Sequence, residues 1–466
     1  MASLSFGKKK KIDMTSGSIL KLLISFAWPL LLGNAFQQFY NTVDSWVVGN
    51  YVSSAAFSAV TTITPIVNLF VSFFTGMSTG CGVLVSQYFG AGREDKVTVT
   101  VHSGFVLILL MGVTITFGGI LLSPVLLNFM NTPEAVFAEA DTYLRIYCAG
   151  LIFLTVYNLG AAILRAVGDS TRPTIYLIVT AVVNIVLDLV FVIALNMGVA
   201  GVAWATVIAE AVSMVLVMIA LAREKSAIRF RFKNLLHVEG GILRQIIGIG
   251  IPAGVQSAII SFSNVFVHSY VNAFGEKMMG GYGAYMKVEK FAQLPQQSIQ
   301  LALTTFVGQN IGYGNVKRAK AGVRVSLVLS IGITLVICGL MYVTAPWLVG
   351  FFNPDEEVIR LGAWTIRFMI PFTIVHAACP IFAGGLRGAG EARSIMFIMV
   401  GSYVVFRQIY LFFMTRFVAN TPTVVILGVG LAWVVATVIV GVYYLTRSDK
   451  IYHDAVPESS RHRIIE

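Results

Sequence analysis

The chain has 466 residues, of which 57% are hydrophobic and 12% charged, and its mean hydropathy is +0.81. This composition excludes a soluble globular protein and predicts a membrane protein with about a dozen spanning helices. The net charge of +11 does not indicate a nucleic-acid partner, because the basic residues fall in short segments between apolar runs rather than in one patch.

The chain begins with a basic, polar stretch over residues 1–18. The first apolar run starts at Ile19, is too long for a signal-peptide core and is expected to remain as a spanning helix. Spans are predicted at 19–49, 55–88, 97–122, 142–166, 174–196, 198–222, 244–273, 280–310, 321–349, 358–387, 395–417 and 424–446.

These spans predict an all-α polytopic membrane protein of twelve transmembrane helices. The predicted domains are a cytoplasmic N-terminal tail (1–18), an N-terminal six-helix bundle (19–222), a basic cytoplasmic linker (223–243), a C-terminal six-helix bundle (244–446) and a cytoplasmic C-terminal tail (447–466). The outer connections retain only Lys277, Arg360 and Arg416 among the basic residues. This asymmetry predicts a plasma (inner) membrane protein with both termini in the cytoplasm.

The first span carries polar side chains within an apolar segment. Gln37, Asn41 and Asp44 are spaced i, i+4, i+7, so a helix places them on one face. A charged side chain at the centre of a spanning helix costs roughly 2.5–3.5 kcal/mol. Asp44 therefore needs a partner, water or an ion; the alternative is a packing stripe in which Asp44 is merely hydrogen-bonded. Pro29 is the candidate hinge of this helix.

The two halves of the chain are copies of each other. SQYFGAGRED at Ser86 recurs as GQNIGYGNVK at Gly308, and LRAVGD at Leu164 recurs as LRGAGE at Leu386, both at an offset of 222 residues. Because each copy holds an even number of spans, both copies insert in the same orientation. The pseudo-twofold axis then runs along the membrane normal, with a cavity between two bundles that rock to give alternating access.

The tract WPLLLGNAFQQFYNTVDSWVVG at Trp28, the paired QxxGxG and LRxxGD/E turns and the repeat resemble the multidrug and toxic compound extrusion (MATE) transporters over essentially the whole chain. The resemblance implies a MATE-like fold and a secondary active multidrug efflux antiporter. Its expected substrates are lipophilic, cationic compounds, exported in exchange for H⁺ or Na⁺. The other expected partners are membrane lipids, and the protein is expected to be a monomer without ATP or another cofactor.

The resemblance also implies a cation-coupling site. In that family an acid of the first helix works with an Asn and an Asp of the fifth and a Thr of the sixth; the matching residues are Asp44, Asn184, Asp188 and Thr206. Helical rise places Asp44, Asp188 and Thr206 about 8–12 Å from the outer ends of their spans, so all four residues are expected in the outer half of the membrane. This oxygen set suits Na⁺, and two nearby carboxylates also suit a shared proton. The alternative is that Asn184 and Asp188 are only an interhelical hydrogen-bonding pair.

The second half departs from part of the family. The NorM-like branch carries acids in the seventh and tenth helices, whereas the corresponding spans here have none, which favours the DinF-like branch and coupling within the first bundle. The eighth span instead holds charged and polar side chains that lipid would reject. The candidate substrate-cavity residues are Gln37, Asn41, Asn158, Gln256, Lys287, Glu289 and Gln293. The alternative for Lys287 and Glu289 is an outer mouth where they are simply solvated.

Several absences narrow the function class. No GxxxxGK[ST], HExxH or GxSxG motif occurs, so the sequence predicts neither ATP binding nor an enzyme. A flippase of a lipid-linked precursor shares the repeated-bundle architecture and is the alternative function. A flippase is expected to show a cavity lined with basic residues, whereas the first bundle is acidic.

Overall fold

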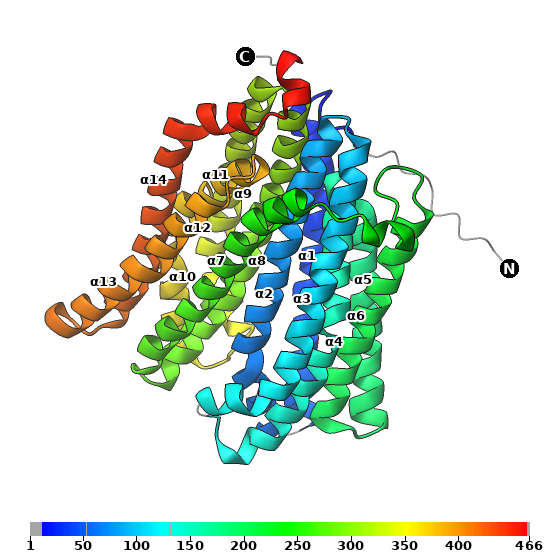
Figure 1. Cartoon of the computed structure of the whole chain (residues 1–466). Coiled ribbons are helices and arrows are strands. Elements are labelled where there is room, and N and C mark those ends of the chain that lie inside the picture. The colour runs from blue at the N-terminus through cyan, green and yellow to red at the C-terminus, as the bar shows by residue number, and fades with distance from the viewer. Residues whose placement is uncertain (1–11, 53, 131, 464–466) are drawn as a thin grey trace.

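The computed structural model describes residues 12–52, 54–130 and 132–463, and its regular elements there are all helices. The side chains at 41, 44–46, 48–50, 54–58, 61 and 62 lie outside this description. Figure 1 shows the helices of the first half, blue to green, beside those of the second half, green to red. The chain is an all-α polytopic membrane protein, as its sequence predicts.

The first half consists of α1 (Ile19–Tyr51), α2 (Ser54–Gly90), α3 (Glu94–Phe129), α4 (Glu134–Ala166), α5 (Thr171–Asp188) continued by the π-helical η1 (Leu189–Ala194), and α6 (Gly198–Arg223). The linker contains the 3₁₀ helix η2 (Phe232–Leu236). The second half consists of α7 (Gly240–Asn272), α8 (Glu276–Tyr313), α9 (Val316–Gly350), α10 (Glu356–His376), α11 (Cys379–Gly388), α12 (Arg393–Val400), the π-helical η3 (Gly401–Phe406), α13 (Arg407–Phe413), the π-helical η4 (Met414–Val418), α14 (Pro422–Ala455) and η5 (Glu458–Arg463).

The helices extend beyond several of the predicted spans. The helix α4 begins at Glu134 rather than 142, and α14 continues through Ala455 into the predicted C-terminal tail. Hydropathy marks only the segment of a helix that lipid surrounds, and a helix continues into water where packing supports it. At the end of α14 this support comes from Tyr452, which is buried and lies edge-on to Tyr444 with ring centroids 6.2 Å apart.

One helix does not look like a spanning helix by hydropathy alone. Within the described residues, 11 helices are long and apolar enough to cross a membrane, and α8 is not among them. Lys287, Glu289 and Lys290 lower its mean hydropathy, as do several glutamines. With 38 residues α8 is nevertheless the longest helix of the second half, and it completes the set of twelve. Its buried polar side chains, among them Glu289 and Gln296, face protein and a cavity instead of lipid.

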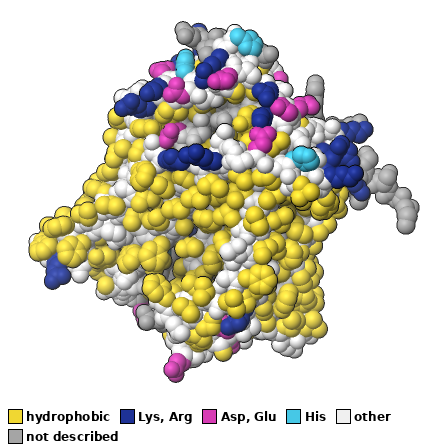
Figure 2. Space-filling view, in the orientation of Figure 1, with side chains coloured by type: hydrophobic (Ala, Val, Ile, Leu, Met, Phe, Trp, Pro, Cys, Tyr) yellow, Lys and Arg dark blue, Asp and Glu magenta, His cyan; other side chains and the backbone are white. Residues whose placement is uncertain are grey.

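The surface divides into bands that match a membrane. On the face seen in Figure 2, a broad apolar band crosses the middle of the molecule, and Lys and Arg side chains gather at the end where α14 finishes and the linker lies. Residues 12–17 lie at the same end, because the Met14 backbone N–H donates to Gln309 Oε1 (3.2 Å) and Ile12 N–H donates to the Gly168 carbonyl (3.2 Å). We refer to this as the terminus end.

The two halves meet along a glycine-rich crossing of α2 and α7. A Cβ added at Gly76 would lie 2.2 Å from the Gly254 nitrogen, and one added at Gly80 would lie 2.7 Å from the Gly250 nitrogen. Gly76 and Gly80 are four residues apart in α2, and Gly250 and Gly254 are four residues apart in α7. Each helix therefore presents its two glycines on one face. Small residues at this spacing allow helix backbones in a membrane to approach closely.

The repeated QxxGxG turns form two matching hydrogen bonds between the halves at the terminus end. Gln87 Nε2 of the first half donates to the Gly388 carbonyl of the second (2.9 Å), and Gln309 Nε2 of the second half donates to the Ala166 carbonyl of the first (2.8 Å). Donors and acceptors are each related by the 222-residue offset of the repeat. The internal duplication has therefore produced two equivalent hydrogen bonds that hold the halves together at this end.

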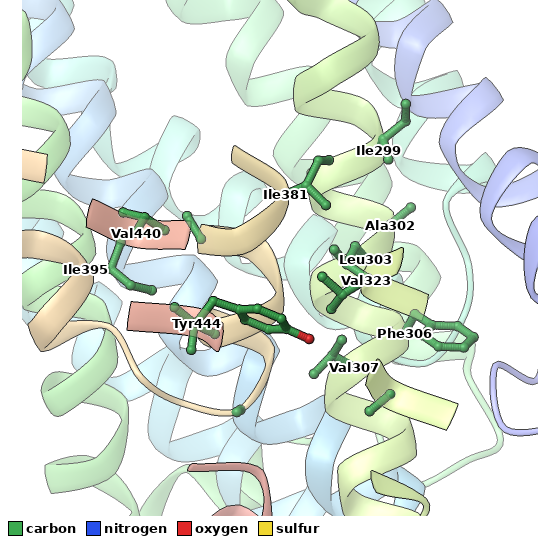
Figure 3. Packing of buried hydrophobic residues seen from close by; sticks show 14 of the residues in the cluster. Ile299, Ala302, Leu303, Phe306, Val307, Val323, Ile381, Ile395, Val440 and Tyr444 are labelled. Carbon is green, nitrogen blue, oxygen red and sulfur yellow. The ribbon is translucent and has the colours of Figure 1, made fainter. Parts of the chain in front are cut away.

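The apolar core near the terminus end joins α8, α9, α11, α12 and α14 of the second half to the start of α1. Figure 3 shows Leu303 and Phe306 of α8, Val323 of α9 and Val440 and Tyr444 of α14 in this cluster. Leu23 and Phe26 of α1 belong to the same cluster and are fully buried. The helix α1 thus packs on the second bundle at one end and on α5 of the first bundle along its length.

Candidate functional site

The two polar residues of the fifth span lie at the point where that helix changes its winding. Asn184 and Asp188 are buried on one face of the last turns of α5, with exposed fractions of 1% and 0%. Directly after Asp188 the helix widens into η1. Wider turns of this kind occur frequently at functional sites. Asn196, with a φ of 51°, then reverses the chain into α6.

The helices that carry the predicted coupling residues are neighbours. The helix α5 packs between α1 and α6, and Thr206 of α6 is half-buried, its hydroxyl donating to the Val202 carbonyl (3.1 Å). Neither polar atom of the Asn184 amide has a hydrogen-bond partner among the residues that the structure describes. The side chains of Asp44 and Asn41 lie outside that description, so the approach of Asp44 to Asp188 remains a prediction.

Pro29 connects the first and fifth spans. Its carbonyl accepts a hydrogen bond from Thr174 Oγ1 of α5 (2.9 Å). A proline removes the donor to the carbonyl four residues earlier, so α1 is weakest here along its axis. This hydrogen bond links the predicted hinge of α1 to α5, which carries Asn184 and Asp188.

Other polar residues predicted from the first half are dispersed. Gln37 is exposed, and Asn34, three residues before it, donates to Ser298 Oγ of α8 (3.4 Å) across the two halves. Asn158 of α4 is partly buried, and its amide nitrogen has no acceptor among the described residues. No hydrogen bond joins Gln37 and Asn158 among the described residues, so each remains a separate candidate for the substrate cavity.

A cavity of 390 Å³ lies within the second bundle. Three predicted residues line it: Gln256 of α7 and Glu289 and Gln293 of α8. Glu289 is buried and accepts hydrogen bonds from Gln293 Nε2 (3.1 Å) and from Thr373 Oγ1 of α10 (3.4 Å). Lys287 is placed differently, because its ammonium lies 5.0 Å from the centroid of the Phe352 ring and outside the cavity lining.

Three charged residues within the helices were not predicted as site residues: Arg407 is buried, and Arg387 and Glu210 are half-buried. Arg387 and Arg407 line the same cavity as Glu289, and Glu210 of α6 lies near Tyr147 of α4. A signal was available, since an ionisable residue inside a spanning segment is by itself a candidate functional residue. What the sequence lacks is the pairing of distant helices that brings Arg387 and Arg407 to one cavity.

Comparisons with known proteins agree with this architecture. The MatE family model matches the chain twice, over residues 29–190 and 252–413. A relative described as the probable multidrug resistance protein YpnP of Bacillus subtilis (strain 168) is 29% identical over 441 residues, covering 93% of this chain and 97% of the relative.

Two solved structures have the same fold. A MATE in complex with MaL6 superposes with a TM-score of 0.90 at 20% identity, covering 95% of this chain and 99% of that one. An outward-facing conformation of a multidrug resistance MATE family transporter of the MOP superfamily gives a TM-score of 0.89 at 19% identity, with the same coverage. The chain therefore belongs to the MatE family, the multidrug and toxic compound extrusion transporters, and not to a family of enzymes.

Proposed function

We propose that this transporter is an antiporter that exports lipophilic cationic compounds in exchange for H⁺ or Na⁺. The observation that carries the proposal is the buried pair Asn184 and Asp188 at the junction of α5 and η1. Oxygen donors in a lipid-surrounded helix suit a hard cation or a proton. Two carboxylates, an amide oxygen and a hydroxyl from Asp44, Asp188, Asn184 and Thr206 form the proposed coupling set, a possible Na⁺ site.

The location of this set favours the DinF-like branch. The seventh and tenth spans, here α7 and α10–α11, contain no carboxylate beyond the first turn of α10. A buried carboxylate of the second bundle, Glu289, comes from α8 and accepts hydrogen bonds from neutral side chains. Coupling in the first bundle leaves the second bundle free to bind substrate.

Alternating access follows from the way the two bundles meet. The terminus end is sealed by the reciprocal bonds of Gln87 and Gln309, and the fold resembles that of the MATE transporter described as outward-facing. We therefore assign the terminus end to the cytoplasm of a plasma membrane and the present state to an outward-facing one. The bundles 19–222 and 244–446 act as the two rocking units of a monomer.

The test is efflux of a cationic dye from proteoliposomes under an imposed proton or sodium gradient. Dye movement that one of the two gradients drives identifies the coupling ion. Dye movement that neither gradient changes would contradict the antiporter.

The lipid-precursor flippase remains the second candidate, because Lys290, Arg387 and Arg407 line the second-bundle cavity. Translocation of a lipid-linked pyrophosphate without export of the dye would favour it.

We expect loss of the reciprocal hydrogen bonds to open the terminus end. Each contributes about 1 kcal/mol, so the double variant Gln87→Ala, Gln309→Ala shifts the equilibrium between closed and open roughly 30-fold towards open. Spin labels on the exposed positions 223 and 450 report the change as a longer interlabel distance. The four native cysteines are buried and do not compete for label. Gln297→Ala, on the exposed face of α8, is the control and leaves the distance unchanged.

We expect Pro29→Ala to slow transport by about three- to tenfold, because the restored N–H stiffens α1 where it contacts Thr174. The initial rate of dye efflux in vesicles measures this effect. Pro124→Ala, in the interior of α3, is the matched control. Equal rates for the two variants would remove Pro29 from the mechanism.

A further inference from the structure

The second-bundle cavity has a charge opposite to that of the proposed coupling site. Its lining residues all lie between Gln256 and Trp433, and they include three cations, Lys290, Arg387 and Arg407, against one acid, Glu289. Two histidines, His268 and His376, also line it. A partly open cavity with an excess of positive charge attracts anions.

The two arginines are held in place by neutral partners. Arg407 has an exposed fraction of 2%, and its Nη2 donates to Ser263 Oγ of α7 (2.7 Å). Arg387 Nη2 donates to Gln256 Oε1, also of α7 (2.8 Å). In both side chains the buried Nε has no acceptor among the described residues. Each guanidinium is thus held in orientation and retains a buried N–H without an acceptor among the described residues.

The acid of the cavity does not neutralise these arginines. Glu289 is engaged by Gln293 and Thr373, and none of the ion pairs between described residues involves Glu289, Lys290, Arg387 or Arg407. A buried charge without a counter-ion is costly, and a ligand that supplies one recovers that cost. The guanidinium fork matches carboxylate and phosphate oxygens in particular.

Two of the three cations, Lys290 and Arg407, depart from the internal repeat. Positions 289, 290 and 407 are Glu, Lys and Arg, whereas their counterparts 222 residues earlier are Val67, Asn68 and Ile185. Conversely, the counterparts of Asn184 and Asp188 in the second half are Phe406 and Tyr410. Arg387, by contrast, corresponds to Arg165, so the second copy differs in having Lys290 and Arg407, whereas the first copy has the acid pair.

We propose that the second-bundle cavity binds amphiphilic organic anions, with a carboxylate or phosphate group held by Arg387 and Arg407, and that such anions are a second substrate class of the exporter. The volume of 390 Å³ suits a drug-sized molecule. Met286, Met399 and Trp433 supply an apolar wall for its body. This inference rests on the proposed export function and extends it beyond cationic compounds.

The test is equilibrium binding of two fluorescent probes to the purified full chain in phosphatidylcholine nanodiscs. The probes are dansyl-phenylalanine, which has a free carboxylate, and its methyl ester. We expect the native protein to bind the carboxylate at least about tenfold more tightly than the ester. Arg387→Gln and Arg407→Gln each remove most of this preference and leave ester binding within about twofold. Arg407→Lys, which retains the charge, preserves part of it.

Arg360→Gln is the matched control, because Arg360 is an exposed arginine of α10 in the same bundle and outside the cavity. Equal affinity of the native protein for acid and ester, or a preference that survives in the arginine variants, would overturn the proposal. Nanodiscs containing phosphatidylglycerol distinguish the source of the anion. If phosphatidylglycerol competes with the probe and Arg387→Gln abolishes this competition, the site binds a lipid head group. That result would overturn the proposed substrate class. Binding requires no gradient, so binding without export contradicts only the transport function.

Discussion

Asp188→Asn is expected to abolish ion-coupled efflux while the protein still folds and inserts. The side chain is fully buried in a helix within the apolar belt, beside Asn184 on the same face of α5. Asparagine keeps the shape but removes both the negative charge and the ability to bind a proton. A hydrogen bond to a charged group contributes about 1.5–3 kcal/mol, so the affinity for the coupling cation falls at least roughly tenfold.

The measurement is dye efflux from proteoliposomes under a proton or sodium gradient, with the native protein alongside. Asp44→Asn is expected to give the same loss, because the proposed set requires both acids. Asp95→Asn is the control, since this carboxylate is exposed at the start of α3, where it pairs with Arg93. Normal coupled efflux by both Asp188→Asn and Asp44→Asn would show that the cation binds elsewhere, and Glu289 would then be the acid to test.

The second large effect is expected from Gly76→Ala. The added Cβ would lie 2.2 Å from the Gly254 nitrogen, a backbone atom that cannot turn aside, so α2 and α7 must separate. Overpacking of this kind costs about 1–3 kcal/mol or more. Because the crossing joins the two bundles, we expect both a lower melting temperature and at least about a tenfold loss of efflux.

Gly118→Ala in α3 is the matched control, because an added Cβ there has no heavy atom within 4 Å. The same substitution in an open helix position is favourable by about 1 kcal/mol, so this variant melts at or above the native temperature. Thermal unfolding in detergent and efflux in vesicles are measured for both variants. If Gly76→Ala behaved like Gly118→Ala, the bundles would not be in close contact at this crossing.

The residues that line the cavity were only partly predictable from the sequence. A cluster in α8 was recognisable as too polar for lipid, and Glu289 and Gln293 do line a cavity. The sequence did not distinguish Lys287, which lies over Phe352, from Lys290, which faces the cavity. These lysines are three residues apart, so a small difference in helix rotation decides which neighbour each one meets.

The sequence by itself determined the spans, the duplication and the family. Lipid requires long apolar segments with internally satisfied backbones, and a repeated motif at a constant offset is visible without coordinates. Only the tertiary structure decided which distant side chains meet: Gln87 with the Gly388 carbonyl, Arg407 with Ser263, and Glu289 with Thr373. It also decided where α5 widens into η1. These features depend on the packing of whole helices against one another, and that packing leaves no local pattern in the chain.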